Sequence, residues 1–131
     1  MTTTRIDIGL ALVRRAEQWL VTQRRPDAHL GGMWEFPGGK RAPNETIEAT
    51  ALRELWEECA VRATAERVLP AVDWDYADRH VRLWPVLCRW VSGDGEARES
   101  LACHWVTTAK LAELPMPPAN AVLVRALSAG R

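Results

Sequence analysis

Three glutamates in the middle of the chain have the spacing that a metal-assisted reaction on a phosphate would need. Glu54, Glu57 and Glu58 stand at positions i, i+3 and i+4, so on a helix their side chains project from one face. Such like charges repel one another and destabilise an isolated helix. Magnesium relieves this repulsion, because it prefers carboxylate oxygens and completes its coordination shell with water and substrate phosphates. The spacing therefore indicates a metal site that processes phosphates.

The alternative is a solvated helix face, on which Arg53 pairs with Glu57 at i+4 and does nothing more. Two flanking features favour the metal site. The segment 35–39, which reads Glu-Phe-Pro-Gly-Gly, predicts a short strand followed by a turn, where glycines let the backbone approach an ion or a phosphate. The same helix also has a second face that is suited to burial, which carries Leu52, Leu55, Trp56 and Cys59.

Strands and helices alternate along the chain and must position these acids. The patterns predict strands at 6–13 and 19–24, a helix at 47–59 capped by Thr46, a long antiparallel pair at 68–76 and 81–91, a turn at 93–95, a short strand at 104–106 and a helix at 120–128. Pro85 within the second long strand indicates a bulge or a sheet edge. The order predicts an α/β (α+β) fold with a mixed sheet between two helices.

Composition agrees with a single small domain over residues 1–131, since 47% hydrophobic residues are enough to fill one core. Basic and acidic residues both total 17, which argues against a nucleic acid polymer as partner. Three cysteines without metal-type spacing favour reduced thiols and a cytoplasmic location. The apolar run near the N-terminus is too short for a membrane helix, and a monomer is expected. Most of the seven tryptophans should be core residues, Trp34 being the exception considered for function.

The segment 39–61 resembles the signature of the Nudix hydrolases. Its spacing is G-x5-E-x7-R-E-L-x-E-E-x-A-V, and eight of the nine defining positions agree over 23 residues. Gly39 and Glu45 fall on structural positions of that signature. Ala60 is the exception, because the family has a glycine there, which commonly ends a helix in a left-handed conformation. The resemblance implies an α/β/α sandwich. The alanine at position 60 leaves open how the helix ends.

The resemblance extends to the MutT branch of that family, which hydrolyses 8-oxo-dGTP to the monophosphate and pyrophosphate. It rests on the segments 22–25, 27–29, 35–40, 78–80 and 117–120 and covers residues 6 to 127. It implies a small nucleoside triphosphate as the partner. Asn120 can both donate and accept, as an 8-oxo purine edge requires. The other implied substrate-binding residues are Arg24 and His29 for phosphate, Glu35, Phe36, Pro37 and Gly38 along the base pocket, and Asp78 and Arg79 over the base.

The same resemblance implies the chemistry. Magnesium, or manganese in its place, would be held by the Gly38 carbonyl with Glu54, Glu57, Glu58 and Glu99. Water would attack the β-phosphorus, with Glu54 as the preferred base and Glu99 as the second choice. Arg53 would orient the glutamates by charged hydrogen bonds, and Glu45 would secure the loop before the helix.

Several alternatives stay open at the level of sequence. Asn120 could cap the last helix, Asp78 and Arg79 could be an ordinary turn pair, and His29 and Glu99 could be solvated. A second Nudix activity, on dCTP, CTP or another nucleoside triphosphate, would use the same acids with a different base pocket. A non-catalytic Nudix-like module that binds a nucleotide or a lesion is a third possibility, but it is disfavoured by the retained glutamates and the absence of basic excess.

Overall fold

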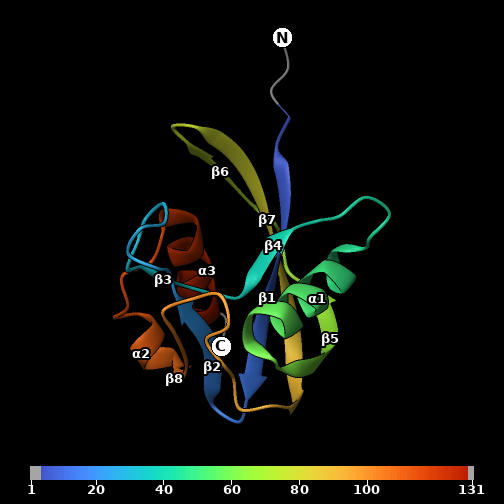
Figure 1. Ribbon diagram of the computed structural model, residues 1–131, viewed down its shortest axis with the longest axis vertical. Coiled ribbons are helices and arrows are strands. Elements are labelled where there is room, and N and C mark those ends of the chain that lie inside the picture. The colour runs from blue at the N-terminus through green and yellow to red at the C-terminus, as the bar shows by residue number, and fades with distance from the viewer. Residues whose placement is uncertain (1–3, 130–131) are drawn as a thin grey trace.

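The computed structural model describes residues 4–129, in which one mixed sheet lies between helices on both faces (Figure 1). The order is β1 (Ile6–Arg15), β2 (Gln18–Gln23), β3 (Trp34–Glu35), β4 (Gly38–Lys40), α1 (Ile47–Cys59), β5 (Arg62–Val68), β6 (Val72–Tyr76), β7 (Arg79–Ser92), β8 (Ala102–Thr107), α2 (Thr108–Leu111) and α3 (Pro118–Ala129). The strands run in the order β3-β2-β1-β7-β5, with β4 on β1, β6 on β7 and β8 on β2. Strands β1 and β7 are parallel, and the other pairs are antiparallel. The predicted fold class is confirmed.

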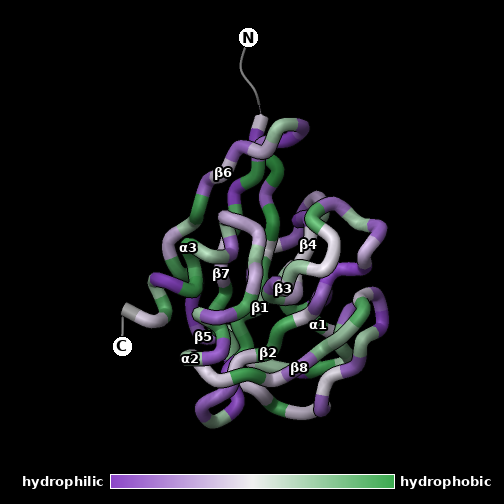
Figure 2. Tube along the Cα trace, turned by 90° about the vertical axis from the view of Figure 1, so that its left-hand side faces the viewer, coloured by the Kyte–Doolittle hydropathy of each residue, from purple (hydrophilic) through white to green (hydrophobic). Residues whose placement is uncertain are grey.

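Strand β1 forms the centre of the core because its side chains alternate between the two faces of the sheet. Leu10 and Leu12 pack into the cluster that contains α3, whereas Ala11 and Val13 pack into the cluster that contains α1. All four are buried, and this hydrophobic stretch is visible in the middle of Figure 2. Burial on both faces fixes the register of β1 and therefore the position of the strand β4 that pairs with it.

Helix α1 begins and ends where the sequence predicts. The Thr46 side chain accepts a hydrogen bond from the Ala49 N–H at 3.1 Å and caps the first turn. Ala60 adopts the left-handed conformation, with φ 55° and ψ 39°, and donates its N–H to the Trp56 carbonyl. The helix thus ends as it would with glycine, although this conformation destabilises alanine by about 1 kcal/mol.

Four secondary-structure predictions need correction. The strand β5, which ends at Val68, was missed, so the predicted strand 68–76 is interrupted before β6 begins at Val72. The predicted turn at 38–39 is strand β4, and the helix α2 was not foreseen. Pro85 lies in the central strand β7 rather than at an edge. Its carbonyl accepts from Leu69 N–H, so its ring nitrogen faces the break between β5 and β6, where no ladder hydrogen bond is lost.

The predicted burial of Trp56 is also wrong, since 37% of this residue is exposed. Of the tryptophans in residues 4–129, Trp19 is buried and the other five are half-buried. The three cysteines are free thiols. No helix between residues 4 and 129 has the length and hydropathy that crossing a bilayer would require.

Candidate active site

Arg53 lies at the centre of a hydrogen-bonded group on the exposed face of α1. Its guanidinium donates to the Glu45 carboxylate at 2.7 and 3.0 Å, to Glu54 at 2.9 Å and to Glu57 at 3.2 Å. It also donates to the Lys40 carbonyl at 3.3 Å, which ties the helix to β4. These carboxylates raise the pKa of Arg53. The geometry agrees with a residue that orients acids, while its catalytic role stays a prediction.

Glu45 fastens the loop that precedes α1. Its Oε1 accepts from the Ala42 N–H at 3.0 Å and from the Thr50 hydroxyl at 2.7 Å. The hydrogen bonds from Arg53 and Thr50 lower the pKa of Glu45 to about 2. The charged carboxylate therefore joins the loop, the first turns of α1 and Arg53 into one unit.

Glu54 lies against strand β4 because Gly39 has no side chain. An added Cβ at Gly39 would stand 2.5 Å from Oε2 and 2.8 Å from Oε1 of Glu54. Any residue other than glycine would therefore displace this carboxylate. The signature glycine and the first glutamate of the acid face are thus in direct contact.

Glu58 is half-buried among other acids. Burial, a hydrogen bond with Glu54 and the negative charges of Glu54, Glu35 and Glu99 raise the pKa of Glu58 to about 9. Glu54, Glu35 and Glu99 therefore all lie near Glu58, while their predicted part in metal binding stays a prediction. Glu57 is instead more exposed and bonded to Arg53, with 47% of its side chain accessible.

Glu99 comes from the loop between β7 and β8, which is distant from α1 in the sequence. Together with Glu35 and Glu58 it lines an open cleft of about 200 Å³, whose other walls come from Thr22, Arg24, Arg25, Ala28 and Ser100. The Arg25 guanidinium donates to the Glu99 carbonyl at 3.4 Å. Arg25 is a cleft residue that sequence reasoning missed. Its position beside Arg24 in a run of two arginines was the available signal.

The described part of the chain, residues 4–129, contains no preformed group of three or more His, Cys, Asp or Glu side chains arranged to hold a metal ion. The donor chemistry nevertheless suits a hard divalent cation. Glu58 is drawn toward its neutral form by burial and by three neighbouring carboxylates, and a cation between them would stabilise the charged forms. Glu54, Glu58 and Glu99 stay the predicted magnesium ligands, and Glu57, also predicted, is engaged by Arg53 in this structure.

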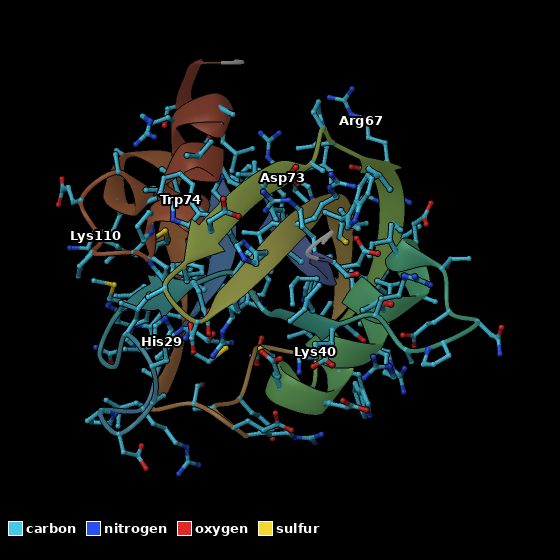
Figure 3. All side chains as sticks on the ribbon, turned by 90° about the horizontal axis from the view of Figure 1, so that it is seen from above. His29, Lys40, Arg67, Asp73, Trp74 and Lys110 are labelled. Atoms are coloured by element: carbon cyan, nitrogen blue, oxygen red, sulfur yellow. The ribbon has the colours of Figure 1, made fainter. Side chains whose placement is uncertain are left out.

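The predicted phosphate-binding residues are already engaged within the protein. Arg24 pairs with Glu35 through Nε at 3.0 Å and Nη2 at 2.9 Å, and donates to the His29 carbonyl at 2.7 Å. Burial raises the pKa of Glu35, and Arg24 opposes this rise. His29, labelled in Figure 3, is exposed, and its ring forms a T-shaped contact with the ring of Tyr76, with 5.6 Å between centroids.

Asn120 is not the cap of the last helix, because α3 begins two residues earlier at Pro118. Its side chain is 5% exposed, and its oxygen accepts from the Phe36 N–H at 3.3 Å. The side chains of Phe36 and Pro37 are fully buried and support this region from within the core. Tyr76, whose hydroxyl reaches the Ala119 backbone, was missed. It is the single tyrosine of the chain, directly before the segment 77–80.

Asp78 and Arg79 lie at the tip of the β6–β7 hairpin, which projects from the body of the molecule (Figure 1). They form an exposed ion pair at 3.5 Å. Trp34, by contrast, packs against His104 of β8, with ring centroids 5.3 Å apart. Two elements therefore meet near Tyr76. The β6–β7 hairpin brings Asp78 and Arg79, and helix α3 brings Asn120, which follows Ala119.

Comparison with known proteins identifies close relatives along nearly the whole chain. A family profile described as the NUDIX domain matches residues 9–126. The chain is 29% identical over 94% of its length to an 8-oxo-dGTP diphosphatase of Escherichia coli (strain K12), covering 96% of that protein. It is 30% identical over 96% of its length to a CTP pyrophosphohydrolase of the same strain, covering 93% of it. The solution structure of the E. coli ORF135 protein superposes with a TM-score of 0.84 at 27% identity, covering 98% of this chain and 94% of that one.

Proposed function

The chain belongs to the NUDIX domain family of hydrolases, and on this basis we propose that it hydrolyses 8-oxo-dGTP to 8-oxo-dGMP and pyrophosphate with the help of magnesium. Such an activity would remove a mutagenic precursor from the cytoplasmic nucleotide pool. The acid cluster supports the reaction, and a relative named 8-oxo-dGTP diphosphatase supports the substrate. The observation that supports an 8-oxo purine as the nucleobase is the buried amide of Asn120.

Asn120 suits an 8-oxo purine because its amide is held in place and offers both kinds of hydrogen bond. The Phe36 N–H occupies one acceptor site of its oxygen at 3.3 Å, and a carbonyl oxygen has a second. An 8-oxo purine carries a proton on N7, so that site donates to the oxygen while the amide nitrogen donates to O6. A normal guanine has an acceptor at N7, which would face the acceptor oxygen of Asn120, so one hydrogen bond would be lost.

The acids would act on the triphosphate. Magnesium, when bound, would neutralise phosphate charge and lower the pKa of a water molecule. Glu54 can accept the proton of the attacking water, because Arg53 fixes one of its carboxylate oxygens at 2.9 Å. Glu58 and Glu99 would complete the acidic ligands of the site, and Glu99 is the second candidate for the general base.

Arg24 would bind phosphate only by sharing its guanidinium with Glu35. One of its nitrogens bonds to the His29 carbonyl and two are close to Glu35, so a phosphate would compete with a carboxylate for the same donors. Arg25 also lines the cleft. We therefore assign initial attraction of the triphosphate to both arginines together.

The proposal is tested by comparing pyrophosphate release from 8-oxo-dGTP, dGTP, dCTP and CTP with magnesium. We expect the highest kcat/KM for 8-oxo-dGTP. In Asn120→Ala the preference for 8-oxo-dGTP over dGTP should fall by roughly 2- to 10-fold, the worth of one hydrogen bond. Ser128→Ala, at an exposed position of the same helix, is the matched control and should keep the wild-type ratio. A ratio unchanged in Asn120→Ala would contradict the assigned role.

Hydrolysis of CTP is the second candidate. It is favoured by the CTP pyrophosphohydrolase that matches this chain at 30% identity over nearly its whole length. A pyrimidine presents a different edge to Asn120, so the Asn120→Ala change should leave CTP turnover nearly unaffected. A wild-type preference for CTP in the same panel would establish this second activity and overturn the first.

A further inference from the structure

Trp56 is an exposed residue of α1 whose ring lies close to two arginine guanidiniums. The Arg62 guanidinium carbon lies 3.8 Å from the centroid of the ring, and that of Arg98 lies 5.3 Å from it. The cation–π attraction of both arginines compensates for leaving an indole at the surface. Arg62 is the first residue of β5, whereas Arg98 belongs to the loop that joins β7 to β8. The indole therefore connects α1 to a loop that is distant in the sequence.

Arg98 is also bonded to the backbone at the C-terminal end of α1. Its N–H donates to the Glu58 carbonyl at 3.1 Å, and its guanidinium donates to the Trp56 carbonyl at 3.4 Å. Two residues earlier, the Glu96 N–H donates to the Cys59 carbonyl at 2.8 Å. The Glu58 and Cys59 carbonyls are among the last four of the helix, which have no partners within it, whereas the Trp56 carbonyl also accepts from the Ala60 N–H. A cation is favourable at that end. The loop thus completes the helix end at Trp56, Glu58 and Cys59.

The next residue of the loop is Glu99, which shares the acid-lined cleft with Glu58. Beyond it, the Leu101 N–H donates to the Gln23 carbonyl at 2.9 Å, which anchors the loop to β2. Glu99 therefore stands between two anchors, one on α1 through Arg98 and one on β2. Its distance from Glu58 depends on how firmly Arg98 is held.

We propose that Trp56 is a positioning residue, which holds Glu99 beside Glu58 through its contact with Arg98. The inference rests on the proposed function, in which Glu58 and Glu99 serve phosphate hydrolysis. Trp56 occupies the variable position between Leu55 and Glu57 of the acid segment, so the signature itself does not prescribe an aromatic residue there. In this chain the ring of Trp56, which lies among the glutamates of α1, would therefore also fix the position of Glu99, which comes from a distant loop.

The loop that carries Arg98 and Glu99 begins with two glycines in the left-handed region. Gly93 and Gly95, at its start, have φ values of +96° and +95°, a conformation that glycine adopts readily and other residues rarely adopt. Gly93 is also packed so closely that an added Cβ would lie 2.5 Å from the Ala60 carbonyl oxygen. The Arg98 side chain, stacked on Trp56, supplies a side-chain contact after this glycine-rich start.

Two measurements test the proposal on the full-length protein. The first is a double-mutant cycle of kcat, using Trp56→Ala and Glu99→Gln. Trp56→Ala should lower kcat by roughly 10-fold with KM nearly unchanged, because a small displacement of Glu99 costs turnover. Trp56→Phe, which keeps an aromatic face for Arg98, should restore most of the loss. In the Glu99→Gln background, Trp56→Ala should add less than about a 2-fold loss.

The second measurement is hydrogen exchange of the backbone amides of residues 96 and 98, which needs neither substrate nor metal. Exchange there should be faster in Trp56→Ala and in Arg98→Ala, and close to wild type in Trp56→Phe. Arg67→Ala is the control, because Arg67 is exposed on β5 and lies on the far side of the molecule from His29 (Figure 3). It should change neither the exchange nor kcat.

Independent losses in the double-mutant cycle, or unchanged exchange in Trp56→Ala, would overturn the inference. A wild-type protein inactive on every nucleoside triphosphate would instead refute the proposed function. The exchange measurement would still decide whether Trp56 holds the loop.

Discussion

Replacing Gly39 by alanine should lower turnover by roughly 100-fold while the protein stays folded. The added Cβ would lie 2.5 Å from Oε2 of Glu54, and ordinary van der Waals contact begins at 3.4 Å. The carboxylate carbon Cδ would be closer still, at 2.4 Å, so the group would have to move by about 1.0 Å, a displacement large enough to misplace a catalytic base. Because Glu54 is bonded to Arg53 and to Glu58, the movement would disturb the whole acid cluster. Gly39 lies outside the left-handed region, so alanine adds no backbone strain of that kind.

The assay is magnesium-dependent pyrophosphate release at saturating substrate, with denaturant unfolding of the same preparations. Gly32→Ala is the control, since Gly32 has a φ of +83° and no atom within 4 Å of the added Cβ. It should lose about 1 kcal/mol of stability through backbone strain and keep its turnover. If Gly39→Ala were folded and its kcat remained within about threefold of wild type, the contact with Glu54 would have no catalytic importance.

Three further predictions concern the acid helix. Ala60→Gly should raise the free energy of unfolding by up to about 1 kcal/mol, because glycine adopts the left-handed helix exit without the cost that alanine pays; unfolding in urea measures this, and a less stable variant would contradict it. Glu45 has a pKa of about 2 in the folded protein, lower than in an unfolded chain. The stability that Glu45 adds relative to Glu45→Gln should therefore be fully present above about pH 5 and be lost as the pH falls toward 2. A stability difference that stays constant between pH 7 and pH 3 would show that the charge of Glu45 is not what secures the loop. Glu54→Gln should reduce magnesium-dependent turnover by at least about 100-fold without unfolding the protein, and EDTA should bring wild-type turnover to the same background; near-normal turnover of the variant would remove Glu54 from the site.

The local parts of the structure could be predicted from the sequence because their determinants are neighbours in the chain. Helix α1 has its predicted bounds, since Thr46 caps it and Ala60 ends it within the same segment. Strand β5 was missed for the opposite reason. Its residues 62–68 include three charged side chains and only one large aliphatic residue, Val68, and all seven are exposed or half-buried. Pairing with β7, rather than any hydrophobic pattern of its own, makes this segment a strand.

Trp56 and Asn120 were harder to predict because their partners come from remote segments. The helical pattern assigns Trp56 to the buried face, but burial depends on what covers that face, and arginines from β5 and from the 93–101 loop cover it instead. Asn120 fits the pattern of a cap, yet helix α3 starts before it and its oxygen bonds to Phe36, 84 residues away in the sequence. Both outcomes result from tertiary contacts that periodicity does not encode.

The same distinction explains why the reaction is easier to infer than the substrate. Arg53 contacts acids that lie within eight residues of it, so a short segment with fixed spacing can preserve the whole arrangement. The proposed base-binding region would instead combine Asn120 of α3, Phe36 after β3 and the β6–β7 hairpin. Changes in any one of these distant elements can alter base selection and leave the acid segment unchanged. Two relatives with similar identity over similar lengths, one named for 8-oxo-dGTP and one for CTP, are therefore expected. Residues around Asn120 and Tyr76, rather than overall identity, should decide which of the two activities this chain performs.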